Sequence, residues 1–150
     1  MRGIRILAVF VGLIIDLALS VVWSIVFSIG LILYLTQRPG HHASFSVPEI
    51  HALLRTVPVM LINTAAGGGT ALIGGFVTGW VAKTDRGKNA SALAIVELVV
   101  SLPFLVLMMN GYPAWYPLAG CIVTVALTLL GGYAANVILS EKSSPVPPIS

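Results

Sequence analysis

The chain has 150 residues, of which 57% are hydrophobic and only 9% are charged, and its mean hydropathy is +1.00. Soluble domains have roughly 45–50% apolar and about 25% charged residues, so this composition excludes an ordinary soluble fold. The net charge is +3. Because the basic residues stand between apolar stretches instead of forming a patch, we expect no nucleic-acid partner. The expected partner is the lipid bilayer.

Four apolar segments predict the architecture. They cover residues 4–35, 57–82, 90–109 and 118–139. Each is long enough to cross a hydrocarbon core, which needs about 20 mostly apolar residues. The sequence therefore predicts an all-α membrane protein, a four-transmembrane-helix bundle over residues 1–139. The polar, proline-rich residues 140–150 are predicted to be a disordered cytoplasmic tail.

A short amphipathic stretch precedes the second span. Residues 47–55 follow the helix-breaking cluster at 37–40. Ser46 with Glu49 three residues later fits a capping box, and Pro48 suits a first helical turn. We therefore expect a short interfacial helix before the second span.

The basic residues predict the orientation of the spans. With the N-terminus inside, one side holds Arg2, Arg5, Lys83, Arg86, Lys88 and Lys142. The other side holds Arg38 and Arg55. Since cytoplasmic loops carry the excess of Lys and Arg, both termini are predicted to be cytoplasmic.

Small residues recur every four positions on two segments. They are Gly67, Ala71, Gly75 and Gly79 in the second, and Gly120, Thr124, Thr128, Gly132 and Asn136 in the fourth. Small residues at this spacing let helix backbones approach closely in lipid. We expect the two faces to meet, within one bundle or across an oligomer. The Gly67–Gly69 run has two open interpretations, dense packing or a helix break that lines a cavity.

A five-residue pattern is repeated in the same two segments. Residues 72–76, LIGGF, recur as residues 129–133, LLGGY. Two duplicated helical hairpins would explain the repeat. A shared packing requirement would explain it as well, and the sequence leaves both open.

Two acids lie inside apolar segments, Asp16 and Glu97. A carboxylate at the bilayer centre costs about 2.5–3.5 kcal/mol or more, so such residues face the protein interior. Both lie at a similar depth from the nearest basic residue, so they could approach each other. Serines continue the two polar faces at four-residue steps: Ser20, Ser24, Ser28 and Ser101. Three interpretations are open: the lining of a proton or cation pathway, hydrogen bonds between helices, and contact with a basic residue of a partner.

The residues for catalysis or metal binding are not arranged in any recognisable pattern. His41, His42 and His51 match no zinc spacing, and Cys121 is the only cysteine. Every histidine lies outside the apolar segments, so no membrane-embedded serine has a base in reach. We expect no catalytic residue, no metal, no cofactor and no enzymatic activity.

Several stretches resemble a group of known proteins. Residues 74–82 (GGFVTGWVA), 112–116 (YPAWY) and 130–135 (LGGYAA) look like small four-helix bacterial membrane proteins of uncharacterised function. The resemblance covers about residues 57–137. It implies four helices and a multi-pass location in the cell inner membrane, and it carries no activity.

Two functions are compatible with these features. The first is an integral inner-membrane protein that acts through helix packing, as a self-assembling homo-oligomer or as an accessory subunit of a membrane-protein complex. The alternative is a small proton- or cation-coupled transporter or channel, with Asp16 and Glu97 lining its pathway.

Overall fold

Five helices and no strand make up the part of the chain that the structure, a computed structural model, describes: residues 4–37 and 46–141. The helices are α1 (Ile6–Thr36), α2 (Val47–Leu54), α3 (Val57–Ala82), α4 (Arg86–Met109) and α5 (Trp115–Glu141). All except α2 are long and apolar enough to cross a membrane. The prediction of an all-helical, four-span membrane protein is confirmed.

Two spans begin earlier than the hydropathy alone indicates. α4 begins at Arg86 instead of residue 90, because Asn89 donates to the carbonyl oxygen of Asp85 at 3.0 Å and Lys88 pairs with the Asp85 carboxylate at 3.1 Å. α5 begins at Trp115 instead of residue 118. Its first turn includes Pro117, which fits there because the first turn of a helix needs no N–H donor at that position. Polar first turns can therefore be helical although they carry no hydropathy signal.

The predicted tail is partly helical, because α5 continues to Glu141. The rest of that tail lies outside the described residues, as do His41, His42 and the basic residues Arg2, Arg38 and Lys142.

The short helix before the second span is confirmed as α2. Its cap forms as the sequence predicts: the backbone N–H of Ser46 donates to Glu49 Oε2 at 3.0 Å. The Ser46 hydroxyl donates to the same oxygen at 2.9 Å. Such a cap satisfies backbone donors that the first turn leaves free.

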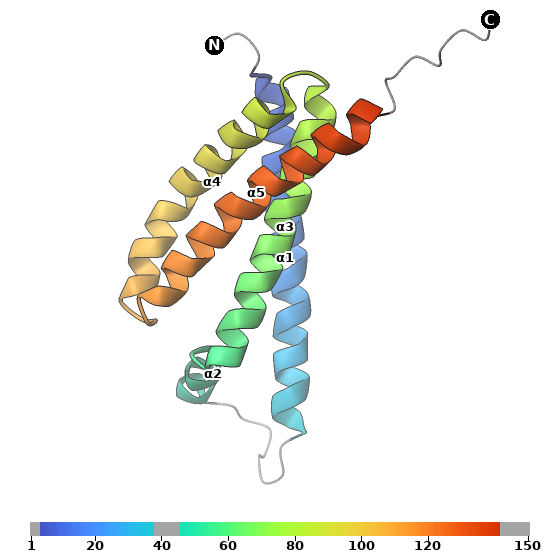
Figure 1. Ribbon diagram of the computed structural model, residues 1–150. Coiled ribbons are helices and arrows are strands. Elements are labelled where there is room, and N and C mark those ends of the chain that lie inside the picture. Colours follow the sequence, from blue (N-terminus) through green and yellow to red (C-terminus); the bar gives the residue numbers. More distant parts are fainter. Residues whose placement is uncertain (1–3, 38–45, 142–150) are drawn as a thin grey trace, which may run out of the picture.

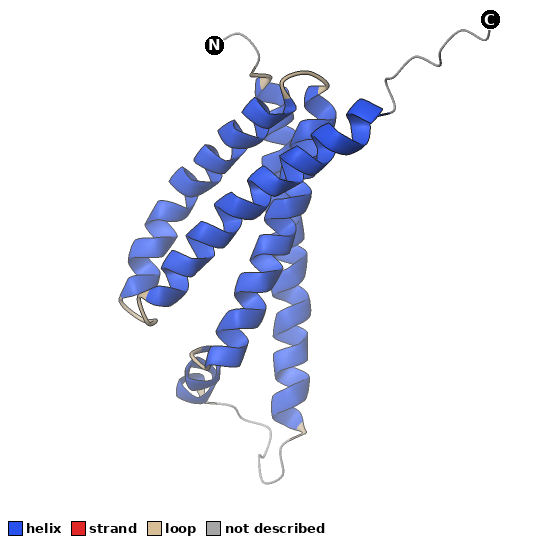
Figure 2. Ribbon diagram, in the orientation of Figure 1, coloured by secondary structure: helices blue, strands red, loops and turns tan. Residues whose placement is uncertain are grey.

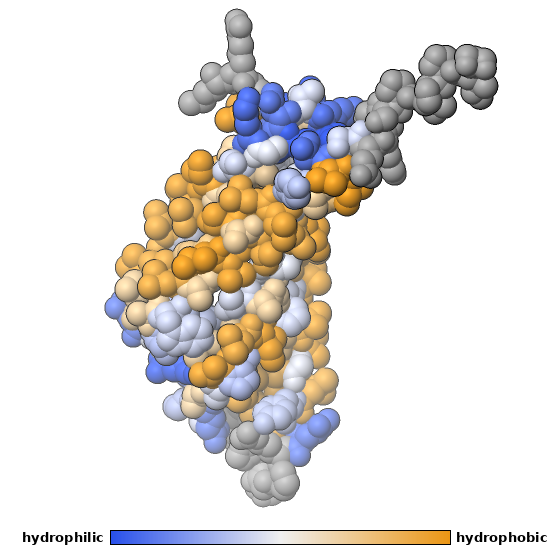
Figure 3. Space-filling model, viewed as in Figure 1, coloured by the Kyte–Doolittle hydropathy of each residue, from blue (hydrophilic) through white to orange (hydrophobic). Residues whose placement is uncertain are grey.

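The four long helices form two antiparallel pairs, α1 with α3 and α4 with α5 (Figure 1). The pairs cross near the end of the bundle that holds the start of α1 and the α3–α4 loop, and they diverge toward the end that holds α2 (Figure 1). Figure 2 shows that short loops connect α3 to α4 and α4 to α5. We call the first end the basic end, because it carries the described residues Arg5, Lys83, Arg86 and Lys88. Hydrophilic surface gathers at this end, above a broad hydrophobic band (Figure 3).

α3 is the central helix, since it packs against every other helix, most extensively against α5. A Cβ on Gly75 would overlap the backbone carbonyl of Thr128, and a Cβ on Gly131 would overlap the carbonyl of Leu72. The two repeated Gly-Gly segments therefore lie against each other. Their mutual contact is a packing reason for the shared pattern, whatever its origin.

α1 meets α3 through a second close crossing. A Cβ on Gly12 would collide with the Thr78 hydroxyl and would lie 2.8 Å from the Gly74 carbonyl oxygen. Gly12 and Ala8 are buried one and two turns before Asp16, respectively, on the same face of α1. This face brings Asp16 against α3.

We predict that Gly75→Ala destabilises the folded protein by about 1–3 kcal/mol, the usual cost of overpacking. The added methyl group meets backbone atoms of Thr128, which cannot rotate away as a side chain can. Thermal unfolding in mild detergent measures the effect.

Gly69→Ala is the matched control. A Cβ on Gly69 has no heavy atom within 4 Å, so this change should leave stability equal or slightly higher, as expected for alanine in a helix. Equal losses in the two variants would show that the α3–α5 crossing is not the close contact described above.

Candidate functional site

The two intramembrane acids open into one cavity of about 230 Å³ between the two helix pairs. Asp16 comes from α1 and Glu97 from α4, so the structure brings together two residues that are far apart in the sequence. All four long helices contribute to the lining, which consists of Leu13, Asp16, Leu17, Ser20, Gly67, Glu97, Val100, Ser101, Phe104 and Thr124.

Glu97 is held from one side only. It is 6% exposed, and its Oε2 accepts a hydrogen bond from the Thr128 hydroxyl at 2.6 Å. Thr128 is itself fully buried at the α3–α5 crossing. The other oxygen of Glu97, Oε1, is buried and has no hydrogen-bond partner. A buried polar atom without a partner is costly, and in a native protein it calls for an explanation.

Asp16 has a similar arrangement. Thr70 of α3 is its side-chain hydrogen-bond neighbour, and Oδ1 is buried without a partner. The Ser20 hydroxyl lies 3.2 Å from the Thr70 hydroxyl, which in turn donates to the Gly67 carbonyl. Glu97 is thus held by a hydrogen bond from Thr128, Asp16 lies beside Thr70, and each acid keeps one buried oxygen without a hydrogen-bond partner.

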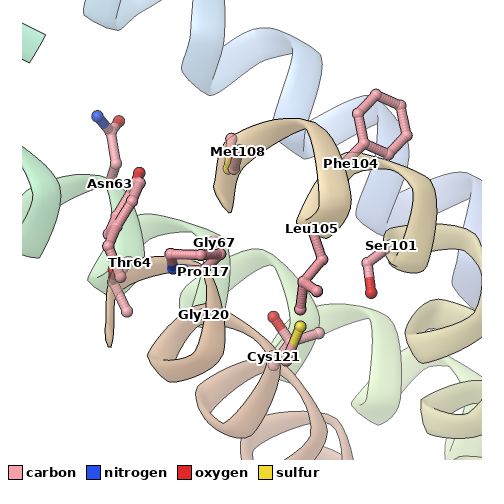
Figure 4. Close-up of a pocket in the computed structure, with 12 residues that line it drawn as sticks. Asn63, Thr64, Gly67, Ser101, Phe104, Leu105, Met108, Pro117, Gly120 and Cys121 are labelled. Carbon is pink, nitrogen blue, oxygen red and sulfur yellow. The ribbon is translucent and has the colours of Figure 1, made fainter. Parts of the chain in front are cut away.

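A second cavity, of about 240 Å³, lies next to the first, and Figure 4 shows the residues that line it. The two cavities share four lining residues, Gly67, Ser101, Phe104 and Thr124. The second cavity lies among α3, α4 and α5 and extends toward Met108 and Tyr116, near the α4–α5 turn. In Figure 4, Leu105 of α4 and Cys121 of α5 approach each other at its wall. Together the cavities connect the acids with the end of the bundle where the helix pairs diverge.

The opposite side of the acids is closely packed. Next to Asp16 toward the basic end lies the crossing of Gly12 and Gly74, with Leu93 fully buried beside Gly12. Farther along, the backbone N–H of Arg5 donates to Asn89 Oδ1 at 2.7 Å, which ties the start of α1 to α4. The second cavity therefore lies on the α2 side of the acids, opposite the close crossing.

A contact joins the two helix pairs near the outer part of the second cavity. The Arg55 guanidinium, at the end of α2, lies over the Tyr112 ring, 5.8 Å from its centroid. Tyr112 packs against Tyr116, which lines the cavity, with ring centroids 5.4 Å apart. Such a cation–π contact is worth about 0.5–1 kcal/mol when exposed.

The remaining members of the polar stripe are divided between the cavities and the outer surface of α1. Ser24 and Ser28 are exposed on α1 and donate to carbonyl oxygens of their own helix at 2.8 and 2.7 Å. Ser101 lines both cavities and donates to the Leu98 carbonyl at 2.9 Å. The stripe is thus not one continuous lining.

The small-residue faces divide in the same way. Near the basic end they form contacts: Ala71 is buried, a Cβ on Gly79 would lie 2.7 Å from Ala135 Cβ, and one on Gly132 would overlap Ala90. Toward the α2 end a Cβ on Gly67 or Gly120 would meet no heavy atom within 4 Å. These two glycines and Thr124 line the cavities, whereas Asn136 is exposed.

The glycine triplet of α3 is helical throughout, so the hypothesis of a helix break is wrong. Of its three glycines, Gly68 has a neighbouring helix packed on it, whereas a Cβ on Gly67 or Gly69 would meet no heavy atom within 4 Å. Gly68 serves the contact with α5, where a Cβ would lie 2.7 Å from Val123, while Gly67 faces the cavity. The triplet combines dense packing with a cavity wall.

Four residues of the site escaped the sequence analysis: Gly12, Thr70, Thr78 and Asn89. Gly12 continues the four-residue spacing of Asp16 and Ser20 backward, so extending that stripe would have found it. Thr70, Gly74 and Thr78 form a second stripe on α3, one position before the glycine face, and it turns toward α1. Asn89 gave no such signal.

We predict that Thr128→Val destabilises the protein by about 1–3 kcal/mol, since it removes the one hydrogen bond to a buried carboxyl group without changing side-chain size. Thermal unfolding in detergent is the measurement. Thr124→Val is the matched control on the same helix, and it should cost less because Thr124 does not donate to Glu97 in this structure. If the control costs as much, the Thr128–Glu97 bond is not important for folding.

No family model matches the chain, and neither a curated protein nor a solved structure matches it. Its function is therefore argued from the site alone.

Proposed function

We propose that this integral membrane protein is a small proton- or cation-coupled transporter or channel whose pathway includes Asp16 and Glu97. The observation that carries the proposal is that both acids open into one cavity between the helix pairs, each with a buried oxygen that has no partner. Intramembrane acids are costly, and acids that line a cavity mark proton or ion pathways in membrane proteins.

The charge distribution around the acids supports this role. Among the described residues that line the two cavities, none is Lys, Arg or His. The threonines that contact the acids are neutral, so no fixed positive charge compensates either carboxyl group. A proton or a bound cation would compensate the charge in a way that can be reversed. Structural hydrogen bonding between helices alone would not require two acids beside a cavity.

The packing and the basic residues support one orientation of the bundle in the membrane. We place the basic end in the cytoplasm, because positively charged loops favour that side. The cavities then open toward the outer side of a bacterial inner membrane, and the Gly12–Gly74 crossing separates the acids from the cytoplasm. Movement of one helix pair against the other would be the means of opening the inner side.

A role through assembly is the second candidate. The glycine faces of α3 and α5 are used within one chain, in the crossing at Gly75 and Gly131, so they do not provide the interface. One exposed surface that carries polar groups is the α2-end half of α1, where Ser24 and Ser28 lie among apolar residues and line a shallow groove. Polar residues at helix surfaces in lipid favour helix association.

Transport is tested in proteoliposomes that contain a pH-sensitive dye. A potassium diffusion potential drives proton movement, with and without an opposing sodium gradient. We expect Asp16→Asn and Glu97→Gln to reduce the flux to that of empty liposomes. Glu49→Gln is the matched control, since Glu49 lies on α2 and glutamine preserves the capping box. Flux that is unchanged in both intramembrane variants would refute the proposal.

Assembly is tested by native mass spectrometry of the protein extracted from its own membrane in mild detergent. For a transporter that acts without an accessory protein we expect only copies of this chain. A second polypeptide at a fixed ratio would instead favour the accessory-subunit hypothesis. Substitution of both Ser24 and Ser28 by leucine would then show whether the exposed face of α1 forms the contact.

A further inference from the structure

The cavity that leads to the acids is unusual for a pathway of small hydrated ions, because its wall is mostly apolar. Phe104, Leu105 and Met108 of α4 face Tyr116 and Pro117 of α5 across the second cavity. Polar groups are few, and the two carboxyl groups lie at the deep end, in the first cavity. An apolar, partly aromatic wall with a few convergent polar groups is typical of sites for small organic ligands.

We infer that the two cavities form a binding site for a lipophilic organic cation, with its ammonium group at Asp16 and Glu97 and its apolar body among α3, α4 and α5. This inference rests on the proposed function and specifies its substrate class. The two cavities together reach the size of small-molecule sites, about 300–1,000 Å³.

The free carboxyl oxygens provide the charge recognition. Glu97 Oε1 and Asp16 Oδ1 are buried, have no hydrogen-bond partner and belong to side chains that line the cavity. Each oxygen is shielded by protein atoms in this structure, and a turn of the carboxyl group would bring it against a cation in the cavity, where opposite charges attract strongly because water is excluded. Glu97 is only 6% exposed, so bulk water does not hydrogen-bond freely to its carboxyl group.

The apolar wall provides the remaining affinity. Burial of apolar surface contributes about 25 cal/mol per Å², which an inorganic ion cannot use. Phe104 lines both cavities and therefore lies between the carboxyl groups and the apolar region, where an aromatic face can also attract a cation. An amphiphilic cation matches both parts of the site.

An inorganic cation matches it less well. Such ions replace their water by several oxygen ligands, six to eight in the case of calcium. Beside the two carboxyl groups, the side chains that line the first cavity offer three hydroxyl oxygens, those of Ser20, Ser101 and Thr124. An ion would also lose its hydration on passing the apolar wall and gain few contacts there.

The lateral opening of the fold suits the same ligand. The helix pairs diverge toward the α2 end, so the second cavity lies between helices that separate at the membrane surface (Figure 1). A lipophilic cation partitions into the bilayer interface, and from there it reaches Met108 and Tyr116 before the carboxyl groups. The apolar end of the site is thus the end that the ligand meets first.

The experiment measures equilibrium binding to the purified full-length protein in mild detergent by isothermal titration calorimetry. The ligand is benzyltrimethylammonium, with neopentylbenzene as its neutral isostere and tetramethylammonium as the cation without an aromatic body. We expect the first to bind at least about tenfold more tightly than either control. Asp16→Asn and Glu97→Gln should each weaken the binding of benzyltrimethylammonium by about tenfold or more.

Glycine substitutions test whether the ligand binds in the cavities or elsewhere on the helix. Gly67→Leu and Gly120→Leu place a side chain in the cavities, where a Cβ meets no heavy atom, and should abolish binding. Gly69→Leu, on the same helix but outside both cavities, should bind as the natural protein does. Thermal unfolding verifies that each variant is folded.

Three results would overturn the inference: equal binding of the neutral isostere, binding that survives both cavity-filling substitutions, and competition by potassium at the concentration of the organic cation. Because this experiment measures binding and not flux, it can fail separately from the proposed function. Competition by potassium together with acid-dependent flux would refute the substrate class and leave the transport proposal. Binding of the organic cation without any flux would refute transport and leave the site.

Discussion

The close crossing of α3 and α5 is the contact on which the rest of the bundle depends. In lipid, helices gain no hydrophobic free energy by meeting, so they associate through van der Waals contact and hydrogen bonds between backbones that come close. Gly75 against Thr128 and Gly131 against Leu72 permit that approach. The same crossing buries Thr128 and directs its hydroxyl to Glu97, so the packing contact also positions one half of the candidate site.

The bundle is dense at one end and open at the other, and small residues explain the difference. Toward the basic end, Gly12, Gly74 and Gly79 each lie against another helix. Toward the α2 end, no neighbouring side chain fills the space beside Gly67 and Gly120, and both glycines line a cavity. A glycine within a close crossing and a glycine beside a cavity therefore have opposite effects, although the sequence spacing is the same.

The position of the acids relates this packing to function. Asp16 and Glu97 lie at the boundary between the dense and open parts of the bundle, where the cavity ends. Each receives one contact from a threonine of a neighbouring helix and keeps one oxygen unpaired. A rearrangement of the helix pairs would change which side of the membrane these oxygens face, and that is the geometric requirement for coupling a cation or proton to transport.

Local sequence was sufficient for the class, the number of spans and most helix bounds. Hydropathy depends on composition over about 20 residues, and α3 occupies the predicted residues 57–82 without change. The sequence also singled out Asp16 and Glu97, because an acid within an apolar segment is rare and can be recognised without any tertiary contact. The starts of α4 and α5 were placed too late, since hydropathy registers neither the contacts of Lys88 and Asn89 with Asp85 nor the helical geometry of Trp115–Pro117.

Only the tertiary structure decided which faces meet. Two stripes on α3, one position apart, turn toward different helices: Gly75 toward α5 and Gly74 toward α1. Their sequence periodicity is identical, so the assignment depends on how the helices cross. For the same reason the sequence could place the acids at a common depth but not in one cavity: depth follows from residue count along a helix, whereas a cavity depends on side chains from four helices that fail to fill the space between them.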